Sequence, residues 1–163
     1  MRDHADRSSR ITRMKPDRSY GNGDSQRRKL LEEELTREII GAFYEVYNAL
    51  GFGLLESLYG RALEIALRRR GLRVDREFPI EVFFQGQQIG VHRLDMLVEQ
   101  RVIVELKASH KLIYADRRQL MSYVTVANLD VGLLLHFGPG PAFQRVLGGR
   151  RPNVKRGNPN SSG

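Results

Sequence analysis

The segment that decides the fold spans residues 90–107, Gly-Val-His-Arg-Leu-Asp-Met-Leu-Val-Glu-Gln-Arg-Val-Ile-Val-Glu-Leu-Lys. Two runs rich in β-branched residues flank the polar tripeptide at 99–101, and this pattern predicts two antiparallel strands joined by a short turn. A three-residue turn pairs Val98 with Val102. The register of the whole hairpin then follows, because each further pair is found by counting outward from the turn.

Three charged side chains share one face of this predicted hairpin. The register places Asp95 opposite Glu105, and the alternation of side chains places Lys107 on the same face. Like charges directly opposite each other are destabilising, since their β-carbons lie only about 4.5–5.5 Å apart. Such a carboxylate pair suits a hard cation such as Mg²⁺, which takes oxygen ligands. An ion cluster on a solvent-exposed sheet face explains the spacing equally well.

Two motifs resemble those of a known family. Asp95, nine intervening residues and then Glu-Leu-Lys at 105–107 resemble the Asp…Glu-x-Lys signature of the PD-(D/E)xK nuclease superfamily. Upstream, Gly-Leu-Leu-Glu-Ser-Leu-Tyr at 53–59 resembles the name-giving motif of the small bacterial GxxExxY proteins, which are grouped in that superfamily. The resemblance covers roughly residues 35–147. It implies an α/β fold similar to restriction endonucleases, with a mixed β-sheet of four to five strands flanked by helices.

The resemblance also implies a chemistry, Mg²⁺-dependent (or Mn²⁺-dependent) hydrolysis of phosphodiester bonds in DNA or RNA. Asp95 and Glu105 would hold the metal, and Glu56 would assist them directly or through a water. Lys107 would position the attacking water or neutralise charge on the phosphate. For Glu56, an acid in a first helical turn that favours the helix dipole is the simpler alternative.

Three further residues are candidates for substrate contact or for support of the metal ligands. In the superfamily a polar residue on the helix after the Glu-x-Lys strand often points at the active site, which implies such a role for Gln119. Tyr123 is four residues further on and shares its helix face. Tyr59, in the upstream motif, is the third. A surface position for Gln119, and ring packing with one hydroxyl hydrogen bond for Tyr59, are the structural alternatives.

A second hypothesis is a non-catalytic module that keeps the nuclease fold to bind nucleic acid or protein. Residues 31–147 carry 14 Lys and Arg against 15 Asp and Glu, a net charge of −1, whereas a nuclease usually presents a basic surface. Neither the type of nucleic acid nor a homodimer or protein partner follows from the sequence.

Basic charge lies mainly in two predicted disordered tails, residues 1–30 with a net charge of +5 and residues 148–163 with +4. Between them, residues 31–147 form one predicted domain. The tails would attract phosphates non-specifically or simply increase solubility. The chain has no cysteine, which excludes disulfides and thiolate metal sites. No apolar run approaches the roughly 20 residues of a membrane span, so we expect a cytoplasmic protein without membrane contact.

The remaining elements follow from hydrophobic periodicity and turn residues. Counting alternate residues back from Asp95 places His92 on the opposite face. The run Arg68-Arg69-Arg70, with Arg73 and Arg76, is either a solvated helix end or a contact for a nucleic-acid backbone. The predicted elements are helices at 31–50 (apolar at Leu35, Ile39, Phe43, Val46 and Leu50), 56–70 (apolar at Leu58, Ala62, Ile65 and Leu67) and 115–128, and strands at 73–84 (broken near Pro79), 131–137 and 142–147.

Overall fold

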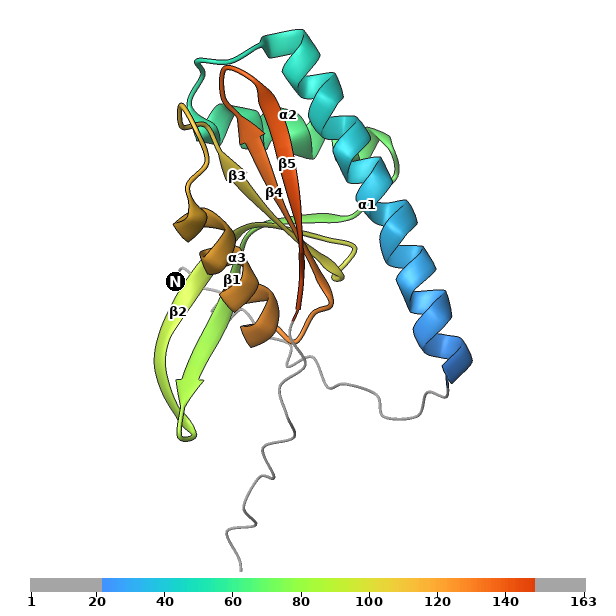
Figure 1. Cartoon of the computed structure of the whole chain (residues 1–163), viewed down its shortest axis with the longest axis vertical. Helices are drawn as coiled ribbons and strands as arrows, with labels where there is room; N and C mark the ends of the chain where they lie inside the picture. The colour runs from blue at the N-terminus through green and yellow to red at the C-terminus, as the bar shows by residue number, and fades with distance from the viewer. Residues whose placement is uncertain (1–21, 149–163) are drawn as a thin grey trace, which may run out of the picture.

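The computed structural model describes residues 22–148 of the chain, which form a five-stranded sheet with helices on both faces (Figure 1). The strands lie in sequence order, and only β3 and β4 are parallel. Helix α3 makes the crossover between them. The predicted α/β fold with a mixed sheet is therefore confirmed. The elements are α1 (Asn22–Leu50), α2 (Glu56–Arg69), β1 (Val74–Phe84), β2 (Gln87–Val98), β3 (Val102–Lys107), α3 (Tyr114–Val126), β4 (Val131–Phe137) and β5 (Pro141–Leu147).

The sheet separates two hydrophobic cores. Helices α1 and α2 pack on one face through buried side chains such as Phe43 and Leu63, which meet Val104 and Leu135 of the central strands. Helix α3 covers the other face with Leu120 and its neighbours. β4 is buried along its whole length because both faces are covered. Within the described residues, no helix has the length and apolar character needed to cross a membrane.

The central hairpin has the predicted register. Val98 pairs with Val102 across a three-residue turn, in which Glu99 and Gln100 have φ of 51° and 55°. The ladder between β2 and β3 ends at the pair Met96–Val104. Beyond that pair the next positions are Asp95 and Glu105, so the two carboxylates lie where the strands stop pairing.

The strand pair β1–β2 changes faces in mid-course. Val74 packs in the core under α1 and α2, whereas Ile80 on the same strand packs in the core under α3. Both have even numbers, and a regular strand would keep them on one face. On β2, Leu94 and Leu97 share a core despite their odd separation. The change coincides with Glu77, whose φ is +50°.

Two sequence-based expectations about where elements begin and end need correction. The first helix begins at Asn22, so residues 22–30 are helical rather than disordered, since Gln, Arg and Lys favour helix without apolar periodicity. The rest of the two predicted tails, residues 1–21 and 149–163, lies outside the described part of the chain. β1 continues through Pro79, which is paired opposite Arg93. A proline is tolerated there because β1 is an edge strand.

The apolar face of α2 was also predicted wrongly. Leu58 and Ile65 are exposed, and the helix instead buries Tyr59, Leu63 and Ala66. The helix is turned this way because the Tyr59 ring stacks on Phe137 at a centroid distance of 4.3 Å. At the end of α1, the predicted stripe holds for its first four residues, while Leu50 is exposed.

Candidate active site

Asp95 occupies the gap that opens between β2 and β3. Its Oδ2 accepts a hydrogen bond from the Leu106 amide at 2.8 Å. The carboxylate thereby replaces a strand carbonyl as the partner of a β3 amide. This bond fixes the Asp95 side chain against β3 and brings its charge close to Glu105.

Glu105 is a buried carboxyl group, with only 7% of its surface exposed. Burial, together with the negative charge of Asp95 and a hydrogen bond to it, raises the pKa of Glu105 to about 8, and the nearby charge of Lys107 opposes this only weakly. Its Oε1 is shielded from solvent and has no hydrogen-bond partner among the described residues. The alternative of a solvent-exposed ion cluster therefore does not hold for Glu105. A buried carboxyl group with one unpartnered oxygen, beside a second carboxyl, is a costly arrangement.

Lys107 ends β3, with about a quarter of its side chain exposed. Its Nζ lies 4.0 Å from Oδ1 of Asp116, in the first turn of α3, which is a long ion pair. The other oxygen of Asp116 accepts a hydrogen bond from the Ile113 amide and so holds the start of α3. The lysine is loosely held and lies close enough to influence the pKa of Glu105.

Glu56 approaches the same end of β3 from the other layer. Its Oε2 accepts a hydrogen bond from the Ala108 amide at 3.2 Å, one residue beyond Lys107. Within residues 22–148, however, no three acidic, histidine or cysteine side chains are grouped closely enough to hold a metal ion. The structure thus brings Glu56 to the end of the strand and does not bring it into a three-carboxylate cluster with Asp95 and Glu105.

The Tyr59 side chain is fully buried, as the ring-packing alternative expects, so direct substrate contact is not available to it and support of the site is the part of the prediction that stands open. Its hydroxyl donates to the Gly51 carbonyl at 2.6 Å and accepts from the Leu54 amide at 3.2 Å. These bonds tie down the loop that leads into Glu56, where Gly53 has a φ of +107° that favours glycine. The motif residues Gly53, Glu56 and Tyr59 therefore act together to place the Glu56 carboxylate.

Tyr123 and Gln119 of α3 lie on the side of the carboxylate pair. Burial raises the pKa of Tyr123, and the charges of Glu105 and Asp95 add to the effect, while a hydrogen bond with Gln119 opposes it. Gln119 itself is exposed and Tyr123 is half-buried, and their contact with a substrate remains a prediction.

His92 belongs to this side of the sheet as well, which corrects the prediction that it points away from Asp95. Its ring stacks on Tyr123 at a centroid distance of 3.7 Å. Burial lowers the pKa of His92, and the charge of Asp95 opposes that shift. The alternate-residue count failed because β1 and β2 change faces near Glu77.

Two residues near the site were not found as site residues by sequence reasoning. Asp116 pairs with Lys107 from α3, and the signal that could have found it is an acid in the first turn of a predicted helix. For His92, no sequence signal marks the change of faces.

The predicted basic cluster is largely paired: Arg68 bonds Glu64, and Arg70 bonds Glu38 and Glu45.

Comparison with known proteins identifies the family of the chain. A search of curated proteins found no match. Among solved structures, the crystal structure of SSO0001 matches with 20% sequence identity and a TM-score of 0.45. That match covers 75% of this chain and 61% of the other, so the chain spans less than two thirds of its length. Residues 33–146 match the family model described as PD-(D/E)XK nuclease superfamily. Because the match covers most of the chain, the protein belongs to the PD-(D/E)XK nuclease superfamily.

Proposed function

We propose that the protein is a divalent-metal-dependent nuclease that hydrolyses phosphodiester bonds in DNA or RNA. The observation that carries the proposal is the buried Glu105, whose Oε1 is unpartnered among the described residues, beside the half-buried carboxylate of Asp95. Such a pair destabilises the fold unless a proton or a cation lies between the carboxyl groups. Family membership supports a nuclease-type fold around this pair.

The donor set fits Mg²⁺ or Mn²⁺. Mg²⁺ is commonly bound through one or two carboxylates and keeps several waters, so Asp95 and Glu105 suffice as protein ligands. One Asp95 oxygen is already fixed by the Leu106 amide, which orients the carboxylate. Glu56 would act through a water, or by holding the Ala108 end of β3. When bound, the metal would lower the pKa of a water and stabilise charge on the phosphate.

The remaining residues would act on the substrate and the water. Lys107 is partly exposed and only loosely paired with Asp116, so its ammonium group is available to orient the attacking water or to neutralise the phosphate. Gln119 and Tyr123 would contact the substrate from α3. Tyr123 is also held by its stack on His92, which would fix the wall of the site.

Titration calorimetry with Mg²⁺ and Mn²⁺ tests the metal site. We expect the wild type to bind one or more ions and Glu105→Gln to lose that binding. Asp95→Asn should lose it as well, although its amide oxygen keeps an acceptor for Leu106. Cleavage of labelled single-stranded and duplex DNA and RNA then tests the activity. Wild-type protein that neither binds metal nor cleaves any of these polymers would contradict the proposal.

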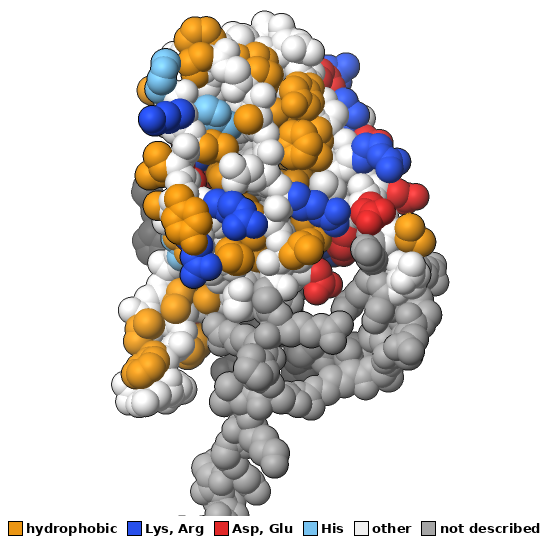
Figure 2. Space-filling model, viewed as in Figure 1, with side chains coloured by type: hydrophobic (Ala, Val, Ile, Leu, Met, Phe, Trp, Pro, Cys, Tyr) orange, Lys and Arg blue, Asp and Glu red, His pale blue; other side chains and the backbone are white. Residues whose placement is uncertain are grey.

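A non-catalytic binding module remains the second candidate, and one observation favours it. The β1–β2 hairpin carries exposed apolar side chains, Phe83, Phe84, Ile89 and Val91, which gather at the lower left of Figure 2. Several exposed apolar side chains on one hairpin are a feature that interaction sites often have. Nucleic-acid binding by the wild type that is indifferent to metal, without cleavage, would favour this function.

A further inference from the structure

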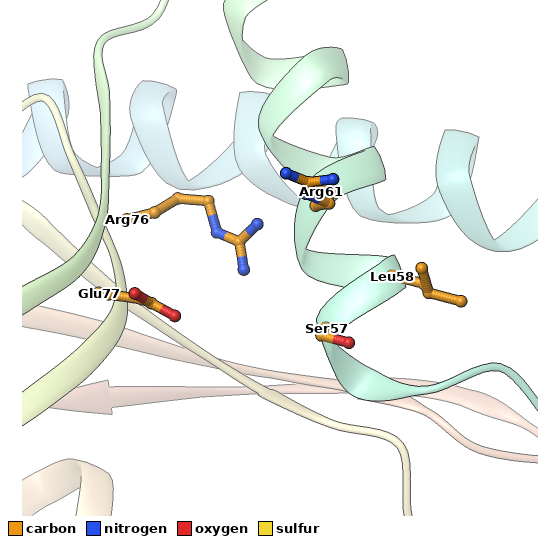
Figure 3. A pocket seen from close by; sticks show the side chains of 5 residues that line it. All are labelled: Ser57, Leu58, Arg61, Arg76 and Glu77. Carbon is orange, nitrogen blue, oxygen red and sulfur yellow. The ribbon is translucent and has the colours of Figure 1, made fainter.

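A pocket of about 470 Å³ lies between the start of α2 and β1 (Figure 3). The side chains that line it are Ser57, Leu58, Arg61, Arg76 and Glu77. In Figure 3, Arg76 reaches from the strand toward the helix that carries Ser57 and Arg61. Two guanidinium groups against one carboxylate give the lining a positive charge.

Two lining residues are neighbours of site residues, one along the chain and one across the sheet. Ser57 directly follows Glu56, whose carboxylate bonds the end of β3. Glu77 falls between the pairs Arg76–Met96 and Phe78–Leu94, so it lies opposite Asp95 in the sheet. These two neighbours link the pocket to the proposed site and are the reason to test a nucleic-acid strand that contacts both.

Arg76 has one donor, Nε, without a partner in the described part of the chain, and its Nη1 is only distantly paired. Its Nε is shielded from solvent and has no hydrogen-bond partner among residues 22–148, and its ion pair with Glu64 is long, at 3.8 Å. The guanidinium passes over Gly60, where a β-carbon would lie only 2.8 Å from Nη2. A glycine inside a helix costs about 1 kcal/mol relative to alanine, so α2 loses stability where it makes room for this side chain.

We propose that this pocket binds a backbone phosphate of the nucleic-acid strand, next to the phosphate that is cleaved. Guanidinium groups match phosphate oxygens with two parallel hydrogen bonds, which an ammonium group does not provide. Arg61 is exposed and would contact the phosphate from α2, and Arg76 already lines the pocket from β1. The inference rests on the proposed function for the position of the scissile phosphate, and it gives the near-neutral domain a local site for a polyanion.

The test measures equilibrium binding of a labelled 12-nucleotide strand to the full chain in EDTA, where no cleavage occurs. Arg61→Ala removes one pocket charge, and Arg69→Ala is the matched control. Arg69 is also exposed on α2 and lies about 12 Å further along the helix axis. We expect Arg61→Ala to weaken binding about tenfold and to lower the slope of log K against log salt by about 0.7. Arg69→Ala should change binding less than twofold.

A second pair of variants does not depend on removing an arginine. Ser57→Asp adds a negative charge to the pocket in the first turn of α2, where an acid suits the helix dipole and should not disturb folding. Ser57→Asn has nearly the same shape without the charge. We expect the aspartate variant to bind the strand at least fivefold more weakly than the asparagine variant. Equal affinities for the two would overturn the inference, as would equal losses in Arg61→Ala and Arg69→Ala.

Strands of the same sequence in DNA and RNA identify the source of the phosphate. If the pocket recognises only the phosphate, each variant should lose the same factor of affinity for DNA as for RNA. A larger loss with one polymer would show that the pocket prefers that polymer. Wild-type protein that binds neither strand overturns the inference. If the variants behave as expected but the wild type cleaves nothing with Mg²⁺, the proposed function fails and the phosphate site stands. If cleavage occurs without these differences, only the phosphate site fails.

Discussion

Replacing Glu105 by glutamine should change how the stability of the metal-free protein depends on pH. The folded protein holds the Glu105 proton up to a pKa of about 8, whereas the unfolded chain loses it near 4.5. Between these values the folded state binds more protons, so raising the pH favours unfolding. The Glu105 contribution is therefore fully present below pH 4.5 and is lost as the pH rises to 8.

The magnitude follows from the size of the shift. Each pH unit between the two pKa values removes 1.36 kcal/mol, so the three units from pH 5 to pH 8 remove up to about 4 kcal/mol. Glutamine has no proton to lose at this position, and its amide can donate to Asp95 as the protonated carboxyl does. We expect Glu105→Gln to resemble the wild type at pH 5 and to be more stable by up to about 4 kcal/mol at pH 8.

Urea denaturation at pH 5, 6.5 and 8 in EDTA measures this difference. Glu34→Gln is the control, because it removes an exposed carboxylate from α1, far from the buried pair. It should shift the unfolding free energy equally at all three pH values. A difference between Glu105→Gln and the wild type that is the same at pH 5 and pH 8 would refute the reasoning. Saturating Mn²⁺ at pH 8 should restore the unfolding free energy of the wild type and leave that of Glu105→Gln unchanged.

Three other substitutions test the roles of single residues. Lys107→Gln should lower kcat at least 100-fold and change Mg²⁺ affinity less than threefold, measured by cleavage and calorimetry; a parallel loss of metal would point to a structural role. Tyr59→Phe removes two hydrogen bonds to the 51–54 loop and should cost about 1–3 kcal/mol in urea, unlike exposed Tyr114→Phe. Gly132→Ala places a β-carbon 2.6 Å from an α3 side chain and should cost about 1–3 kcal/mol, whereas Gly90→Ala meets nothing within 4 Å and should be near neutral.

The sequence predicted best where local rules determine the structure. The hairpin register followed from one turn length, and it correctly predicted the pairs from Val98–Val102 to Met96–Val104, beyond which Asp95 and Glu105 are the next positions. The strand at 131–137 was predicted because a run buried on both faces is apolar throughout. The family motifs then named Asp95, Glu105 and Lys107, and their roles at the site remain a prediction.

Predictions failed where tertiary contacts override a local pattern. The stripe of Leu58, Ala62, Ile65 and Leu67 suggested one buried face of α2, but the Tyr59–Phe137 stack turns the helix and exposes Leu58 and Ile65. Nothing in the sequence reports that contact, because Phe137 lies 78 positions further along the chain. The pocket was missed for a similar reason, since Arg76 was counted with its sequence neighbours rather than with Arg61 across the gap.

A single irregularity in the sheet accounts for both the carboxylate pair and the arginine pocket. At Glu77 the backbone adopts φ of +50°, which costs about 1–2 kcal/mol for a residue with a β-carbon. On one side of this position Arg76 turns toward α2 and lines the pocket, and on the other side β1 packs under α3. Opposite it, Asp95 leaves the regular ladder and bonds the β3 amide of Leu106. Replacing Glu77 by glycine would remove the strain at this residue. The freer backbone would then let the Asp95 carboxylate and the Arg76 guanidinium move independently of each other. We therefore infer that the strained backbone at Glu77 keeps the Asp95 carboxylate and the Arg76 guanidinium in fixed positions relative to each other.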